Sequence, residues 1–301
     1  MPSTTHLATI EDDGRHVPGP QSMPLWNESY WFPFYDPKTE VGVIVRAGIL
    51  PNRQESNLFF FITHRGAVVH SFIDQQAPVP PVDQRRLVLD GFTMEWEKPR
   101  EQFRLRYVEG AHAVDVVWTA YSPVYKWPLP PGVSYDQMTG HIEQGGRVTG
   151  TVTIKGTPYR VDCLSHRDHS WGGERDWSKL HNWDYLSGEI DQNFWFNAVR
   201  IAFGPGFPDI TIGCLWDGKE LHEARDIKIQ AKLQDGGTRQ VGVDARFTDE
   251  NGREYHLIGE QVLVNCLVPY GRTWLKDAIT RYRLGDRVGY GIHEIGYQEQ
   301  P

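Results

Sequence analysis

Cysteine is scarce in this sequence: the 301-residue chain has only Cys163, Cys214 and Cys266. Their number is odd and they lie far apart, which provides neither a disulfide framework nor a CxxC metal-binding motif. This usage is typical of proteins in a reducing compartment, so we predict a cytoplasmic protein.

The chain also lacks an excess of basic charge and a long apolar run. Its 31 Lys and Arg stand against 39 Asp and Glu, for a formal net charge of −8, whereas nucleic-acid binding needs a basic face. The longest apolar run is Leu58–Ile62, and a membrane-spanning helix needs about 20 apolar residues. The first residues show neither the basic nor the apolar region of a secretory signal. We therefore predict no nucleic-acid partner, no membrane span and no signal peptide.

Several motifs of common enzyme classes are missing as well. The sequence has no GxGxxG after a strand, no GxxxxGK[ST], no GxSxG and no HExxH, which disfavours nucleotide binding, α/β-hydrolase chemistry and zincin chemistry. His166, His169 and His181 resemble a metal set, but residues three apart on an extended strand point to opposite faces. The sequence therefore predicts no metal ion and no organic cofactor.

Aromatic residues and turn formers are abundant instead, with 11 Trp, 13 Tyr, 13 Phe, 30 Gly and 20 Pro. Phe103, Leu105 and Tyr107 alternate with residues of the opposite face, which is the period of a half-buried strand. Similar extended runs are expected at 41–50, 56–64, 67–73, 86–96, 102–109 and 114–121. More than a dozen short strands without alternating helices predict an all-β protein.

The sequence suggests three parts. Residues 1–24 are polar and carry several prolines, which predicts a flexible leader that frays or wraps the surface. A boundary near residue 175 predicts two β-domains, 25–175 and 176–301, each a meandering sheet or barrel; no residue-level repeat is visible. Gly145-Gly146 and Gly156-Thr157 are expected to form hairpin turns, and residues 273–282 fit a capped helix or a strand equally well.

Residues 166–185 are dense in ionisable and aromatic side chains, with three His and three Trp. On an extended strand His166 and Asp168 would project to one face, and Arg167 and His169 to the other. A carboxylic acid held near His and against indole rings has its pKa raised by desolvation, so it can act as a general acid. Trp faces attract cations, so these residues could protonate an alkene with the acid and stabilise the resulting carbocation with the indole rings. The alternative is that the cluster only braces a strand end.

The string HRDHSWG (His166–Gly172), followed by Arg175–Trp177, resembles the Asp-His-x-Trp-Gly signature of the carotenoid 1,2-hydratase family. That family includes hydroxyneurosporene synthases and AttH-like proteins, and it is similar to kievitone hydratase-type enzymes and lipocalin-like Diels–Alderases. The resemblance implies two lipocalin-like antiparallel β-barrel or sandwich domains packed side by side, with little helix and a ligand cavity near their junction. It also implies cofactor-free addition of water to an isoprenoid double bond, or a related cyclisation. Ser170 in place of an amide, together with the short chain, favours a terpenoid or prenylated compound smaller than a carotenoid.

Combining the cluster with the resemblance gives a set of candidate site residues. We expect Asp168 to donate the proton, His166 to tune it, and His169 to complete the catalytic group. Three residues are expected to give structural support: Arg167, Arg175 and Asp176. Asp176 or Glu174 would pair with the arginines, which leaves Asp168 free to be protonated. Predicted substrate contacts are Trp171, Trp177, Trp183, Tyr185, Trp195, Tyr30, Trp31 and Glu294. Core packing is the alternative role for these aromatics, and an edge-strand charge is the alternative for Glu294.

The predicted function is that of a cofactor-independent hydratase, hydro-lyase or cyclase acting on a terpenoid or another apolar small molecule. Two other functions fit the same residues: a lipocalin-like carrier that binds an apolar ligand without turnover, and a pericyclase in which shape drives the reaction. The partner in each case is an apolar small molecule. The sequence leaves the oligomeric state open.

Overall fold

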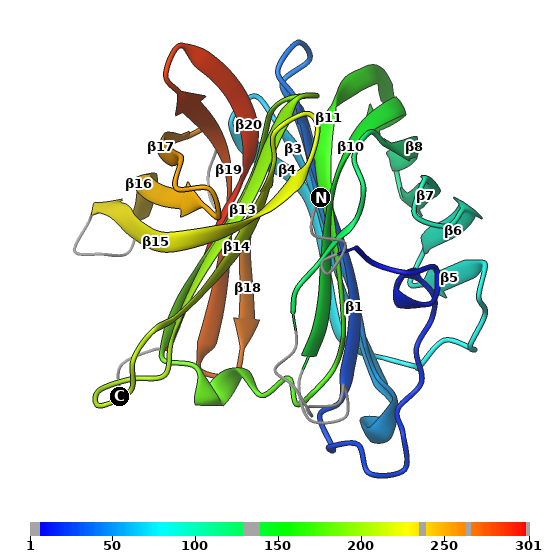
Figure 1. Cartoon of the computed structure of the whole chain (residues 1–301). Helices are drawn as coiled ribbons and strands as arrows, with labels where there is room; N and C mark the ends of the chain where they lie inside the picture. Colours follow the sequence, from blue (N-terminus) through cyan, green and yellow to red (C-terminus); the bar gives the residue numbers. More distant parts are fainter. Residues whose placement is uncertain (1–6, 129–138, 235–238, 263–265, 299–301) are drawn as a thin grey trace. The chain divides into compact units, whose positions relative to one another are not determined.

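The computed structural model describes residues 7–128, 139–234, 239–262 and 266–298. The chain divides into two compact units, the first formed by residues 1–64 and 69–175 and the second by residues 65–68 and 176–301. In Figure 1 the first unit runs mainly from blue to green and the second from green to red. The only helices in the described ranges are the 3₁₀ turns η2 (Glu11–Asp13), η3 (Pro51–Arg53) and η4 (Trp177–Lys179). The protein is therefore all-β, as predicted.

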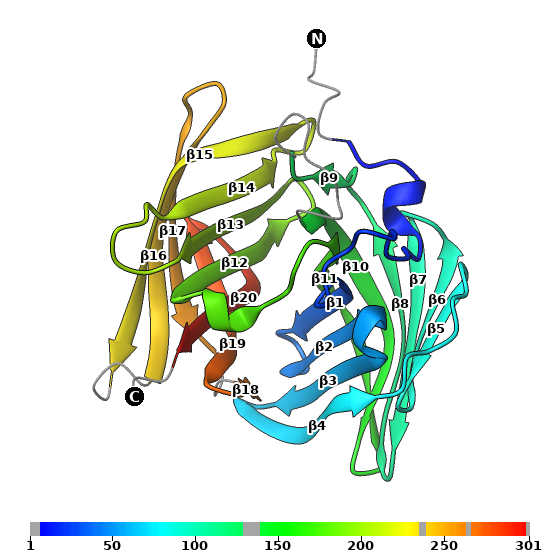
Figure 2. The same ribbon diagram turned by 90° about the horizontal axis from the view of Figure 1, so that it is seen from below.

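The first unit is one antiparallel sheet with the strand order β4-β3-β2-β1-β11-β10-β8-β7-β6-β5, and β9 pairs with β10. Its strands are β1 (Asn27–Asp36), β2 (Val41–Leu50), β3 (Glu55–His64), β4 (Ala67–Ala77), β5 (Arg86–Leu89), β6 (Phe92–Lys98), β7 (Gln102–Glu109), β8 (His112–Ala120), β9 (Tyr125–Lys126), β10 (Thr139–Ile154) and β11 (Thr157–Gly172). Figure 2 shows β1 to β4 side by side in this order. The first strand thus lies between the second strand and the last one.

The second unit repeats this arrangement, with the order β17-β16-β15-β14-β13-β12-β20-β19-β18. Its strands are β12 (Asn182–Asp191), β13 (Phe194–Ala202), β14 (Ile210–Trp216), β15 (Leu221–Gln234), β16 (Arg239–Asp249), β17 (Glu254–Gln261), β18 (Cys266–Tyr270), β19 (Thr273–Leu284) and β20 (Arg287–Gln298). A further pairing of β17 with β19 closes the sheet into a barrel. Here too the first strand, β12, lies between the second and the last.

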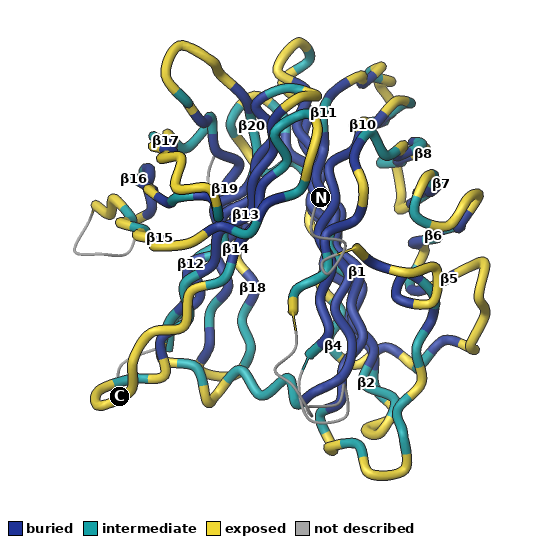
Figure 3. Tube along the Cα trace, viewed as in Figure 1, coloured by how far each residue is buried: buried dark blue, intermediate teal, exposed yellow. Residues whose placement is uncertain are grey.

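Each unit has its own apolar core built from alternate strand residues. In the first, Phe32, Phe60 and Trp118 are at most 1% exposed; in the second, Leu186 and Phe196 are fully buried. Strand β1 is buried along its whole length, as the dark blue tube shows (Figure 3). A strand buried on both faces can carry polar groups only where partners satisfy them. The polar residues of β1 and its neighbours are therefore the place to look for a site.

One local expectation from the sequence is wrong, and one open alternative is decided. Gly145-Gly146 is no turn, because β10 runs straight through it and pairs with β8 and β11 there. A Cβ on Gly146 would lie 2.2 Å from the Trp118 ring, so the glycine makes room for an indole rather than for a turn. Residues 273–282 belong to strand β19 and not to a helix. The expected turn at Gly156 is confirmed between β10 and β11.

The described part of the predicted leader, residues 7–24, packs against the first unit. Asp13 is fully buried, and Ala8, Asp12 and Arg15 are also buried. The Trp96 indole donates to the Asp13 carbonyl oxygen at 2.9 Å, and Lys126 Nζ lies 2.6 Å from the Asp12 carboxylate. Charged side chains of this segment, Asp12, Asp13 and Arg15, are thus buried in the first unit. No described helix is long and apolar enough to cross a membrane.

Candidate functional site

Strand β11 carries the dense cluster and divides it between two faces, as the sequence predicted. Its register sets Asp168 opposite Glu143 of β10 and Trp31 of β1, whereas His169 lies opposite Tyr30. Residues directly opposite in an antiparallel pair share a face. We call the first set the Asp168 face (Trp31, His141, Glu143, His166, Asp168 and Ser170). The second is the His169 face (Glu28, Tyr30, Arg167, His169 and Trp171).

A continuous hydrogen-bond chain runs across the Asp168 face. Glu143 is fully buried, and its two carboxylate oxygens each lie 2.6 Å from the Nε2 atom of a histidine, His141 on one side and His166 on the other. At the far end of the chain, His141 Nδ1 lies 2.6 Å from Ser170 Oγ. His166, expected to tune Asp168, therefore bonds to Glu143.

Asp168 lies on the same face as this hydrogen-bond chain but is not part of it. The carboxyl is half-buried and makes no hydrogen bond to a residue within the described ranges. Burial raises its pKa to about 7, and the charge of Glu143 acts in the same direction, whereas His141, Arg46 and Arg175 act against it. A carboxyl with this pKa is about half protonated at neutral pH, so its acid form is present there to give a proton to a ligand.

His141 and Glu143 were missed by the sequence reasoning. They lie on β10, in a segment interpreted only as one arm of a hairpin, and they reach β11 through pairing that the sequence does not specify. A weak signal existed, because His141 and Glu143 are two apart and so point to one face of a strand. Burial lowers the pKa of His141 to about 4, so this imidazole is neutral at neutral pH.

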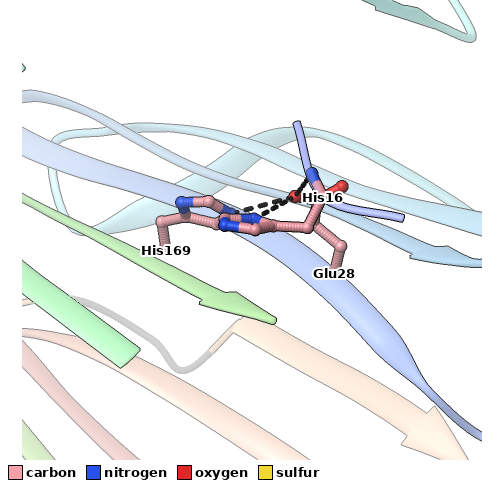
Figure 4. Close-up of side chains that lie close together, drawn as sticks. All are labelled: His16, Glu28 and His169. Atoms are coloured by element: carbon pink, nitrogen blue, oxygen red, sulfur yellow. Dashed lines mark hydrogen bonds and ion pairs between the residues drawn. The ribbon is translucent and has the colours of Figure 1, made fainter. Parts of the chain in front are cut away.

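The His169 face centres on the carboxylate of Glu28 (Figure 4). Its Oε1 atom lies 3.2 Å from His169 Nε2 and 3.0 Å from His16 Nδ1, and it accepts a hydrogen bond from the Tyr30 hydroxyl at 3.0 Å. Arg15 Nε lies 3.0 Å from Oε2. Burial alone would raise the pKa of Glu28, but the hydrogen bonds from His16 and His169 and the charge of Arg15 lower it to about 2. His169, expected to complete the catalytic group, thus binds Glu28 on the face opposite Asp168.

The ligand atoms of His16, Glu28 and His169 lie within 4.8 Å of one another, which is close enough to hold a metal ion. A bound cation would have to share Glu28 with the Arg15 guanidinium, and repulsion between like charges is severe in a buried setting. Oε1 also accepts the backbone N–H of His16 at 2.8 Å. The donors around Glu28 therefore fit a hydrogen-bonded carboxylate better than a metal ligand.

Two of the predicted supporting residues, Arg167 and Asp176, have other partners than expected. Arg167 Nη1 lies 2.7 Å from Asp13 Oδ1, both side chains are fully buried, and the guanidinium lies over the Phe103 ring at 4.4 Å. Asp176 caps η4 and accepts from the backbone N–H of Ser178. Arg175 donates its own backbone N–H to the carbonyl oxygen of Leu25. The leader, and not Asp176, supplies the carboxylate for Arg167.

The substrate contacts predicted in the second unit share one face of its sheet. In the register of β12 with β13 and β20, this face carries Trp183, Tyr185, Trp195 and Glu294. The Trp183 indole donates to Glu294 Oε1 at 2.6 Å, and Trp177 stacks on Trp183 with ring centroids 4.9 Å apart. In the first unit, Trp31 lies on the Asp168 face, whereas Tyr30 and Trp171 lie on the His169 face.

The opposite face of the second sheet repeats the acid–histidine pair of the first unit. His293 Nε2 lies 3.3 Å from Asp184 Oδ1, and Asp184 stands two residues before Leu186, the residue that pairs with His293. Glu28 stands likewise two residues before Tyr30, which pairs with His169. The structure therefore contains an internal repeat that the sequence did not reveal.

Residues 9–299 match the family described as "Domain of unknown function (DUF7064)", and no curated protein is detectably similar in sequence. Three solved structures share the fold over nearly the whole chain. A protein assigned as AttH from Nitrosomonas europaea has a TM-score of 0.74 at 12% identity and covers 99% of this chain and 98% of its own. CghA has a TM-score of 0.65 at 10% identity, with 99% and 97% covered. Kievitone hydratase from Nectria haematococca has a TM-score of 0.62 at 11% identity, with 98% and 94% covered. The predicted resemblance is confirmed at the level of the fold, which is what identities this low can show.

Proposed function

The chain belongs to the DUF7064 family, whose description assigns no activity, and we propose that it is a cofactor-independent hydratase, hydro-lyase or cyclase. Its substrate would be a terpenoid or another apolar small molecule with an alkene. The observation that carries the proposal is Asp168, a half-buried carboxyl with a raised pKa and no hydrogen-bond partner in the described ranges. The fold shared with kievitone hydratase supports it.

The reaction would begin with transfer of the Asp168 proton to one alkene carbon, which forms a C–H bond and leaves a carbocation on the other carbon. Trp31 lies opposite Asp168 and is 5% exposed, and an indole face stabilises a cation by about 2 kcal/mol when water is excluded. The negative charge of Glu143, on the same face, also favours the cation over the neutral alkene.

Capture of the carbocation decides the product. Addition of water gives an alcohol after loss of one proton. Attack by an internal alkene closes a ring and moves the positive charge to a ring carbon, which then loses a proton to form a new double bond. The released proton restores the acid form of Asp168, so the cycle consumes no cofactor.

The experiment is a panel of terpenoid and prenylated compounds incubated with the whole protein and followed by mass spectrometry. Once a compound is converted, Asp168→Asn should lower turnover by at least about a hundredfold, the usual contribution of a general acid. Asp162→Asn is the matched control, because Asp162 lies on the same strand but its exposed side chain pairs with Arg147.

Two results would separate the competing functions. A ligand that binds wild type and Asp168→Asn equally well but is never converted would establish the carrier. Conversion at a near wild-type rate by Asp168→Asn would remove the acid from the mechanism and favour the pericyclase.

A further inference from the structure

A serine, a histidine and a glutamate on the Asp168 face are linked in the order of a hydrolytic triad. We propose that Ser170 is a nucleophile that forms a covalent acyl intermediate with carboxylic esters, with His141 as its base and Glu143 as the residue that orients the base. This activity is separate from alkene protonation by Asp168 and does not depend on it.

The distances of the chain fix the roles of its members. Ser170 Oγ lies 2.6 Å from His141 Nδ1, and His141 Nε2 lies 2.6 Å from Glu143 Oε1. When Nε2 carries the imidazole proton and donates it to the carboxylate, Nδ1 is free to accept the serine hydroxyl. Triads of this kind are recognised by geometry and roles, and they occur on unrelated folds.

The backbone holds the three groups in place. Ser170 and His141 are directly opposite on the paired strands β11 and β10, and Glu143 is two residues further along β10 on the same face. The second oxygen of Glu143 lies 2.6 Å from His166 Nε2. The carboxylate is therefore held from both sides, and the sheet fixes the orientation of the imidazole.

The surroundings favour an ester with an apolar acyl group. The centroid of the Trp127 ring lies 3.9 Å from that of the His141 ring, and Trp31 is on the same face as Ser170. The buried Trp127 Nε1–H has no acceptor within the described ranges. An orphaned donor beside the base can stabilise the oxyanion that develops on an ester carbonyl oxygen.

The chemical step balances without a cofactor. Ser170 Oγ attacks the carbonyl carbon while its proton moves to His141 Nδ1, and the bond to the alkoxy group then breaks. The alkoxide leaves with that proton as an alcohol. A water molecule attacks the acyl group, gives one proton to His141, and releases the carboxylic acid as the proton returns to Ser170.

The test uses an alkyl fluorophosphonate, which traps activated serines covalently. The folded full-length protein is labelled, digested with trypsin and studied by mass spectrometry. Cleavage after Arg167 and Arg175 gives the peptide 168–175, in which Ser170 is the only hydroxyl side chain. We expect the adduct on this peptide, and we expect p-nitrophenyl butyrate to be hydrolysed with a burst.

Variants then assign the roles. Ser170→Ala should abolish both labelling and hydrolysis, and His141→Gln should slow labelling by about a hundredfold or more, as loss of a general base does. Ser29→Ala is the matched control, because Ser29 lies directly opposite Ser170 on β1; it should label at the wild-type rate. An unmodified 168–175 peptide in the folded wild type would overturn the proposal. So would a His141→Gln protein that labels at the wild-type rate.

Discussion

Replacing Glu28 with Gln tests the hydrogen-bond network of the His169 face. The Glu28 side chain is buried, and its pKa is about 2, against an ordinary value of 4.5. One pKa unit corresponds to about 1.4 kcal/mol, so the ionised carboxylate should contribute about 3 kcal/mol to the free energy of unfolding at neutral pH. Because the folded pKa is the lower one, this contribution is fully present above pH 4.5 and is lost as the pH falls toward 2.

The assay is urea unfolding of the wild type and Glu28→Gln over a series of pH values. The two should differ by about 3 kcal/mol near pH 7. The difference should shrink below about pH 4.5, because Glu28 of the unfolded chain then takes up a proton that the folded protein binds only near pH 2. Glu55→Gln is the control. Its partner Arg53 is 49% exposed at the side chain, so the loss should stay below about 1 kcal/mol at every pH.

The pH dependence of the stability difference between the wild type and Glu28→Gln distinguishes a charge effect from a packing effect. A loss that stays constant down to low pH would assign the effect to packing and would refute the argument from charge. A loss near pH 7 no larger than that of Glu55→Gln would show that the donors around Glu28 do not stabilise its anion.

Three other substitutions are predicted from the same structure. If Asp168 acts as the acid, the rate of the wild type should fall as the pH rises through about 7, where the carboxyl loses its proton, and Asp168→Asn should remove this limb from the pH–rate profile. Gly146→Ala should lower the free energy of unfolding by about 1–3 kcal/mol in urea titrations, because the new methyl group overlaps the Trp118 ring. Arg167→Met should cost about 3–5 kcal/mol in the same assay, since it leaves the buried Asp13 carboxylate without its cation; no loss for either variant would contradict the structural argument behind it.

The division of β11 into two faces was predictable from the sequence, because a strand alternates its side chains whatever it packs against. His166 and Asp168 were placed on one face and Arg167 and His169 on the other, and the structure has them so. Local pattern was less informative for turns. Gly145-Gly146 has the composition of a hairpin turn, but a contact between strands explains the glycine at position 146. It leaves space for the Trp118 ring of β8, which pairs with β10 at this point.

The partners of the site residues could not be predicted in the same way. Glu143 reaches Asp168 through the register of β10 with β11, and register depends on the whole sheet rather than on either strand alone. Asp13 pairs with Arg167 from a polar, proline-rich segment that has no strand or helix period. The repeated acid–histidine pair was also invisible, because a shared topology constrains which faces are apolar and leaves most residue identities free.

The contrast between Glu28 and Asp168 carries the assignment of roles in the first unit. Burial is the largest influence on both carboxyl groups and would raise the pKa of each. Glu28 receives hydrogen bonds from its neighbours and faces Arg15, which lowers its pKa to about 2 and keeps it ionised at neutral pH. Asp168 has no such donor in the described ranges, so burial prevails and its pKa rises to about 7. Environments that push the pKa values of neighbouring carboxyl groups apart separate an acid from a structural anion. Hydrogen-bond donors, and not depth of burial, therefore distinguish the two faces of β11, and they leave Asp168 as the group able to give up a proton.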